Sequence, residues 1–130
     1  MPEFTLEVEY VQGADRSVLV VLHGPIDAKA TAFQETLGRL RHEGMVRWIL
    51  EMKDVTYINS TALGHMVNLH DFLEPQGGAI YLVGVPSKVK SVLDMMGLTP
   101  MFKMAMIRSQ ALDAVAKGGT ADRPPPLPPA

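Results

Sequence analysis

The chain has 130 residues, a net charge of -2 and no cysteine. This length suits one domain with one hydrophobic core, and the near-neutral charge gives no electrostatic footprint for nucleic acid. The lack of cysteine excludes disulfides, thiol nucleophiles and cysteine metal sites. No apolar run approaches the roughly 20 residues of a transmembrane helix, and the N-terminus shows no signal pattern, so we expect a cytoplasmic protein without membrane contact.

The first third of the chain predicts two strands and a helix. Apolar and polar residues alternate over residues 4–10, which is typical of a half-buried strand. Residues 17–22 form a continuous apolar run that predicts a second strand, ending at Gly24-Pro25. Asp27 is a candidate N-cap for a helix over roughly residues 28–42; contact with a partner is the alternative role of Asp27.

The rest of the chain alternates strands with helices. Residues 46–52 predict a central strand, because the middle of this segment is apolar on both faces. We then expect a helix over about residues 60–73, a strand over 79–83, a helix that starts at Pro86 and ends at Gly97, a strand over 101–107, and a short helix capped by Ser109.

The resulting order, β-β-α-β-α-β-α-β-α, indicates an α/β fold in which helices pack on a mixed sheet of about five strands. We expect residues 1–117 to form this single domain. Residues 118–130 are rich in glycine and proline, so we expect them to form a disordered tail.

The most informative segment is the turn between the third strand and the second helix, Asn59-Ser60-Thr61-Ala62. Two hydroxyl residues stand where the first backbone N–H groups of a helix lack intrahelical acceptors and where the helix dipole is positive. A phosphate on Ser60 or Thr61 would be well placed there. The alternative is that these residues only cap the helix.

Nothing in the sequence predicts catalysis, a metal or a cofactor. His65 and His70 are five residues apart, which places them about 140° apart around a helix, whereas zinc-chelating pairs are four residues apart. Ser60 lacks the surrounding pattern of a nucleophile elbow. We therefore expect a binding protein and not an enzyme.

Methionines gather near the C-terminal end of the predicted domain: Met95, Met96, Met101, Met104 and Met106. Methionine fills irregular gaps in cores and also serves adaptable binding surfaces. We expect core filling here, and a binding groove is the alternative.

Three segments, in order, make the chain resemble a STAS domain of the anti-anti-sigma factor family over roughly residues 4–116. The first, residues 24–27, is similar to the family's glycine, any residue, aliphatic, aspartate. The second, residues 49–64, resembles a strand followed by Asp-Ser-Ser/Thr-Gly-Leu-Gly. The third, residues 83–98, resembles the family's fourth strand and a third helix that ends in Gly-Leu. Asn59 and Ala62 stand where the family has aspartate and glycine.

The resemblance implies a STAS-like fold and a partner-switching mechanism. Unphosphorylated members bind a serine-kinase anti-sigma factor of the GHKL ATPase type and so release a sigma factor. The kinase phosphorylates the serine after the motif aspartate, and a PP2C-type phosphatase reverses the step. Carried onto this sequence, the phosphoacceptor is Ser60, and the recognition surface comprises Asp27, Asn59, Ser60, Thr61, Ala62 and Gly64.

The resemblance also implies a second role, that of a STAS scaffold which is never phosphorylated. The small subunit of a lipid-transport ATP-binding cassette complex is an example. Asn59 favours this alternative, because an amide lacks the charge of the motif carboxylate.

Overall fold

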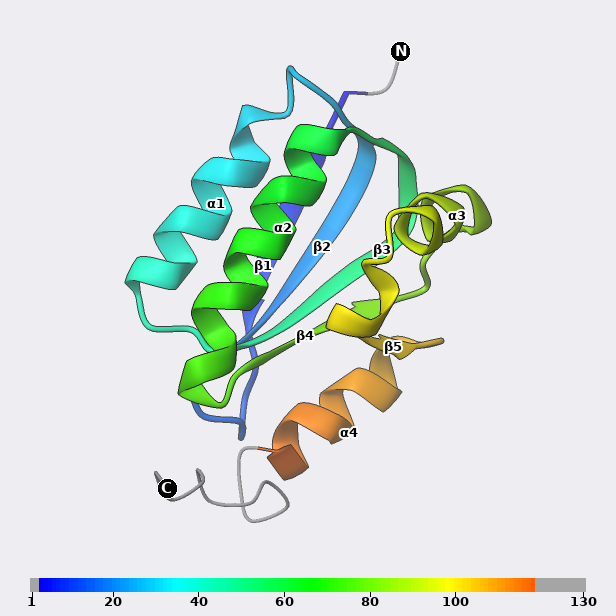
Figure 1. Ribbon diagram of the computed structural model, residues 1–130. Helices are drawn as coiled ribbons and strands as arrows, with labels where there is room; N and C mark the ends of the chain where they lie inside the picture. The colour runs from blue at the N-terminus through cyan, green and yellow to red at the C-terminus, as the bar shows by residue number, and fades with distance from the viewer. Residues whose placement is uncertain (1–2, 119–130) are drawn as a thin grey trace.

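A five-stranded sheet separates two unequal helical layers in the computed structural model, which describes residues 3–118 (Figure 1). The strands are β1 (Thr5–Tyr10), β2 (Ser17–Ile26), β3 (Arg47–Ile58), β4 (Ala79–Val83) and β5 (Lys103–Ala105). The helices are α1 (Thr31–His42), α2 (Ser60–Leu73), α3 (Ser87–Met95) and α4 (Arg108–Gly118), with short 3-10 turns at Glu74–Gln76 and Thr99–Met101.

The strands lie side by side in chain order, from β1 to β5. β1 runs antiparallel to β2, and all other neighbours are parallel. The predicted mixed sheet and element order are therefore confirmed, and so is the central position of β3. Because β2 to β5 share one direction, the segments that follow them all leave from the same edge of the sheet.

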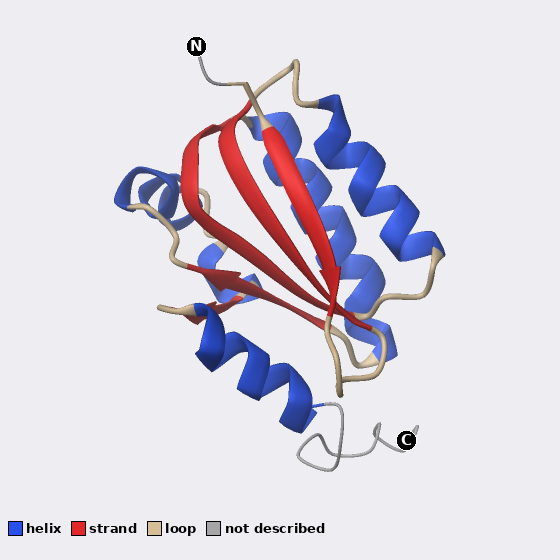
Figure 2. Ribbon diagram, turned by 180° about the vertical axis from the view of Figure 1, so that it is seen from behind, coloured by secondary structure: helices blue, strands red, loops and turns tan. Residues whose placement is uncertain are grey.

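The larger core lies between the sheet and the helices α1, α2 and α3. Phe33 of α1, Met66 of α2 and Leu93 of α3 are buried there against sheet residues such as Leu50. Each fully buried side chain of this size contributes about 1.5–3 kcal/mol. Among the described helices, α4 alone covers the opposite face, where Ala111 and Val115 are buried, and Figure 2 shows this helix from behind.

The two central strands extend further than the sequence predicts. β2 continues through Gly24 and Pro25 to Ile26, and β3 continues beyond the apolar run to Ile58. Register shifts at residues 21–23 and 24–25 of β2 accommodate the glycine and the proline within the parallel pair. The expected end of β2 before Gly24 is wrong.

The C-terminal part differs from expectation in two respects. β5 has only three residues, because Thr99–Met101 forms a 3-10 turn and the Met106 N–H donates to the Gln110 side chain at 2.9 Å. The five methionines between residues 95 and 106 do not fill the core. Met95 and Met106 are both 81% exposed, and Met96 and Met104 are also exposed, so only Met101 packs partly against the core.

No helix within residues 3–118 is long and apolar enough to cross a membrane. Gly118 is the last residue of α4, and the remainder of the predicted tail lies outside the described residues. The predicted extent of the domain and the predicted disorder of the tail stay predictions.

Candidate functional site

The candidate site forms where β2 and β3 end side by side. Ile26 and Ile58 are register partners at the end of the parallel pair. The backbone N–H of Asn59 donates to the Ile26 carbonyl at 3.1 Å, which continues the pairing by one residue. Asp27 and Asn59 therefore start their two turns next to each other, at the edge from which α1 and α2 leave.

Asn59 is the N-cap of α2. Its backbone is extended, with φ -97° and ψ 171°, and its side-chain oxygen accepts a hydrogen bond from the Ala62 N–H at 2.8 Å. Its own carbonyl accepts from the Leu63 N–H at 3.1 Å, which is the first bond of the helix. Asn59 thus supplies the cap, and the alternative in which Ser60 or Thr61 caps the helix is wrong.

Ser60 and Thr61 are the first two residues of α2, and both are exposed. Within residues 3–118, neither hydroxyl has a hydrogen-bond partner. The cap uses the N–H of Ala62, so the N–H groups of Ser60 and Thr61 are available to an anion. The first turn of α2 contains no acidic side chain, so nothing in it opposes added negative charge.

Asp27 does not cap α1, which corrects the prediction. Its carboxylate accepts from the Lys29 N–H at 2.9 Å, and its carbonyl accepts from the Ala30 N–H at 3.0 Å. These bonds close a turn, so α1 begins only at Thr31, with Ala30 in the cap position and no side-chain cap. Asp27 is half-buried beside Asn59, which leaves partner contact as its remaining predicted role.

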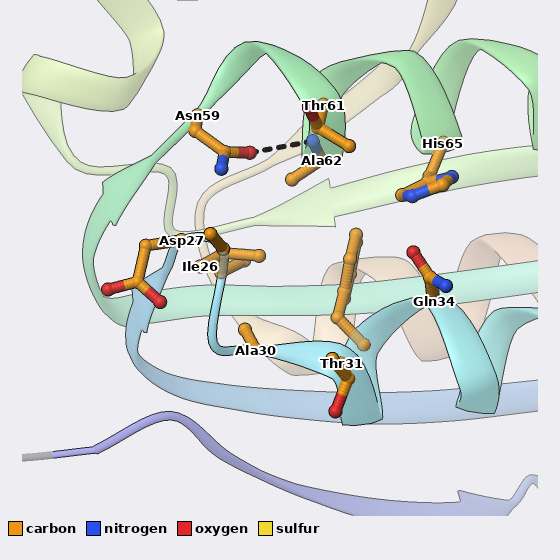
Figure 3. A pocket seen from close by; sticks show the side chains of 11 residues that line it. Ile26, Asp27, Ala30, Thr31, Gln34, Asn59, Thr61, Ala62 and His65 are labelled. Atoms are coloured by element: carbon orange, nitrogen blue, oxygen red, sulfur yellow. Dashed lines mark hydrogen bonds between the residues drawn. The ribbon is translucent and has the colours of Figure 1, made fainter.

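A hollow of about 190 Å³ separates the starts of α1 and α2 (Figure 3). Of the predicted site residues, it brings together Asp27, Asn59, Thr61 and Ala62. Ser60 stands at the helix start beside the hollow without lining it. Gly64 is exposed on α2 and is not part of the lining.

Seven lining residues were not in the predicted set, and three of the seven are polar. Thr31 and Gln34 come from α1, and His65 comes from α2. The Nε2 atom of His65 is buried and has no hydrogen-bond partner among the described residues. His65 follows Thr61 by four residues, so helical spacing could have placed it on the same face. No sequence signal places the two α1 residues there.

Gly24 explains why the first motif begins with glycine. Its φ is +88°, and a Cβ at this position would lie 2.7 Å from the backbone oxygen of Glu3. Glycine therefore allows the N-terminal segment to pass close to β2, three residues before Asp27, which begins the turn at the site.

Across the described residues, no group of three His, Cys, Asp or Glu side chains is placed to hold a metal ion.

The chain belongs to the STAS domain family, whose model matches residues 6–111. This confirms the resemblance seen in the three sequence segments. Comparison with curated protein sequences found no match.

Solved structures show the same fold. A putative anti-sigma factor antagonist from Thermotoga maritima is 24% identical with a TM-score of 0.76, over 86% of this chain and 95% of that one. The phosphorylated form of the Bacillus cell fate determinant SpoIIAA is 20% identical with a TM-score of 0.68, over 85% and 99%. A sulfate transporter family protein from Wolinella succinogenes is 18% identical with a TM-score of 0.64, over 78% and 85%.

Proposed function

We propose that this protein is an anti-anti-sigma factor that regulates transcription by partner switching, with Ser60 as its phosphoacceptor. The observation that carries the proposal is the first turn of α2. Asn59 caps this turn through Ala62, and the hydroxyl of Ser60 is exposed beside N–H groups that have no helical acceptor. The structure named as a putative anti-sigma factor antagonist and that of the phosphorylated Bacillus cell fate determinant SpoIIAA share the fold, which supports the proposal.

In its unphosphorylated form, the domain binds a GHKL-type serine kinase that acts as the anti-sigma factor, and the sigma factor is released. The contact surface consists of the hollow and its border, and includes Asp27, Asn59, Ser60, Thr61, Ala62 and Gly64. A PP2C-type phosphatase restores the binding form. The domain itself performs no catalysis, and the whole cycle takes place in the cytoplasm.

The physical basis of the switch is one added phosphate group, whose negative charge the fold tolerates and the complex does not. A phosphate adds about -1.5 to -2 charges, which the start of α2 accommodates. At an interface that faces the kinase's nucleotide phosphates, the same charge is repelled and has to lose its water. A coupling of about 3–4 kcal/mol would change the affinity several hundredfold.

Incubation with ATP and the GHKL kinase encoded in the same genome, followed by mass spectrometry, tests the proposal. We expect one phosphate on Ser60, which Ser60→Ala abolishes and Thr61→Ala retains. In calorimetry, Ser60→Asp should bind the kinase at least about a hundredfold more weakly than Ser60→Ala. Equal affinities of these two variants, or an active kinase that leaves the domain unmodified, would overturn the switch.

Asn59 favours a second candidate function, that of a scaffold subunit docked to a transporter without phosphorylation. The amide preserves the cap but brings no charge to the acceptor serine. The similarity to a sulfate transporter family protein supports this candidate. Copurification with an ATP-binding cassette subunit, unaffected by Ser60→Asp, would distinguish it from partner switching.

A further inference from the structure

A groove runs between α1 and α2, which lie side by side on the same face of the sheet (Figure 1). Beyond the hollow beside Ser60 it widens into a second hollow of about 270 Å³, whose lining includes Gln34, Gly38 and Arg41 of α1 and His65 and Asn68 of α2. Gln34 and His65 line both hollows, so the two spaces adjoin. Along α2, the combined lining runs from Thr61 to Leu69, a rise of about 12 Å.

The junction of the two hollows holds an open hydrogen-bond position. Figure 3 shows the side chains of Gln34 and His65 pointing towards one another from the two helices. The Nε2 atom of His65 is buried, and no described residue forms a hydrogen bond with it. Buried polar atoms without a partner are uncommon in folded proteins. The groove therefore contains a polar group that the domain itself does not satisfy.

Gly38 has no structural reason to be a glycine. It lies in the middle of α1 without a positive φ, and a Cβ there would meet no atom within 4 Å beyond its chain neighbours and the backbone of its own helix. Glycine weakens a helix interior relative to other residues, and nothing inside the domain requires it at this position. Its missing side chain keeps the groove open down to the α1 backbone, as the close approach of another chain requires.

Arg41 supplies the charge of the second hollow. It is the one charged side chain among the described lining residues of this hollow at neutral pH. Its guanidinium carbon lies 4.7 Å from the centre of the Phe72 ring, which is 43% exposed. Within residues 3–118, Arg41 forms no ion pair, whereas Arg39 pairs with Glu43 at 3.2 Å. Arg41 is thus a cation on an exposed ring without a counter-ion, and arginine and aromatic side chains are frequent anchors of interfaces.

We propose that the groove between α1 and α2 binds a segment of the same kinase that contacts Ser60. The inference rests on the proposed function and extends its contact surface along the two helices. The main chain of the segment passes over Gly38, and an Asp or Glu side chain of the segment pairs with Arg41 beside the Phe72 ring. Because Gln34 and His65 line both hollows, the two contacts form one continuous interface.

A second copy of this chain is the competing occupant. Seated in the groove, it would cover Gln34 and His65 and so exclude the kinase from the hollow beside Ser60. A symmetric contact between two grooves would also offer Arg41 only another Arg41, because no acidic residue lines the second hollow. Charge and continuity therefore both favour the kinase.

Calorimetry of the full chain with the GHKL kinase encoded in the same genome tests the proposal. Gly38→Gln fills the groove, and we expect it to weaken binding about tenfold. The same change should raise the melting temperature by roughly 2 °C, because glutamine favours a helix interior more than glycine does. Ala32→Gln is the matched control and should bind like the wild type, since Ala32 is exposed on α1 outside both hollows.

The charge is tested in the same titrations. Arg41→Ala should weaken kinase binding at least about fivefold, because the partner carboxylate loses its cation. Arg39→Ala removes a cation of the same helix that lies outside the groove, so it should weaken binding less than about twofold. Arg41→Ala alone decides the question if Gly38→Gln melts below the wild type.

The outcomes separate this proposal from the proposed function. If the wild type binds the kinase and Ser60→Asp weakens that binding, but Gly38→Gln and Arg41→Ala bind as tightly as their controls, only the groove proposal is overturned. If the wild type does not bind the kinase at all, the proposed function fails and the groove proposal fails with it. A dimer of the free domain in light scattering that Gly38→Gln dissociates would assign the groove to a second copy and overturn the proposal.

Discussion

Replacing the side chain of Asn59 measures how much the N-cap stabilises the start of α2, where the candidate switch lies. Asn59→Ala removes the oxygen that accepts from the Ala62 N–H at 2.8 Å. The main-chain bonds from Asn59 to Ile26 and from Leu63 to Asn59 do not depend on the side chain and remain. The change therefore isolates one hydrogen bond, at a helix start that is otherwise intact.

We expect Asn59→Ala to lower the free energy of unfolding by about 1 kcal/mol, within a range of about 0.5–2 kcal/mol for lost N-caps. For a domain of this size, that loss lowers the melting temperature by roughly 4 °C. Urea unfolding followed by circular dichroism measures the free energy, and thermal melts measure the temperature shift.

Ser60→Ala and Thr61→Ala are the matched controls, because neither hydroxyl caps the helix. Each should change the free energy of unfolding by less than about 0.5 kcal/mol. Asn59→Asp keeps the acceptor and adds a charge that the helix dipole favours, so it should equal the wild type or exceed it by about 0.3–1 kcal/mol. The reasoning fails if Asn59→Ala is as stable as the two controls, or if Asn59→Asp loses as much as Asn59→Ala.

Three further predictions concern the fold around the site. Gly24→Ala adds a Cβ at positive φ against backbone, so urea unfolding should show a loss above about 1 kcal/mol; a neutral result would contradict the close approach. Arg108→Ala leaves the buried Glu51 carboxylate unpaired, and we expect a loss of about 1–3 kcal/mol at neutral pH, with Glu51→Gln less affected. The Thr99 hydroxyl, with Lys90, holds the pKa of Asp94 below its ordinary value, so Asp94 adds stability above that ordinary value and loses this stability as the pH falls below it and through the lowered pKa. In Asp94→Asn, the urea midpoint should depend less on pH in this acidic range. An unchanged pH dependence would be evidence against the hydrogen bond between Thr99 and Asp94.

Local patterns predicted α2 to the residue. An apolar stripe, two hydroxyl residues at its start and Pro75 after its end all lie within one continuous stretch of sequence. β3 was predicted too short because Lys53 and Asp54 are exposed and polar. They remain in the strand because β2 pairs with this part of β3, and that pairing is a tertiary contact with no local signal.

The candidate site could likewise be predicted only where it depends on local sequence. Asn59 and Ser60 follow from the sequence around them, whereas Gln34 enters the hollow only because α1 packs beside α2. The predicted cap at Asp27 is wrong because an aspartate bonds as readily to a backbone N–H two residues ahead as to a helix start. Helix placement depends on contacts beyond the local sequence, whereas the turn at Asp27 is one of two local alternatives open to an aspartate.

The methionines illustrate the limit of composition as a guide to burial. Met104 alternates with Ala105, whose side chain packs towards α4 on the smaller core. Whether Met104 is covered depends on how far α3 reaches over the edge strand, which no property of methionine determines. The structure leaves it 38% exposed, and an expected core residue becomes a surface residue.

β3 lies in the middle of the sheet and stays paired with β2 up to Ile58, one residue before the cap. Amide hydrogens in such a strand exchange with solvent only when the whole domain opens. In the proposed switch, the kinase would consequently meet Ser60 within the folded shape of the domain, with α2 already formed and the turn at Asp27 beside it. A synthetic peptide spanning residues 55–66 would contain every neighbouring side chain in sequence and lack that shape, so it should be a poor substitute for the domain.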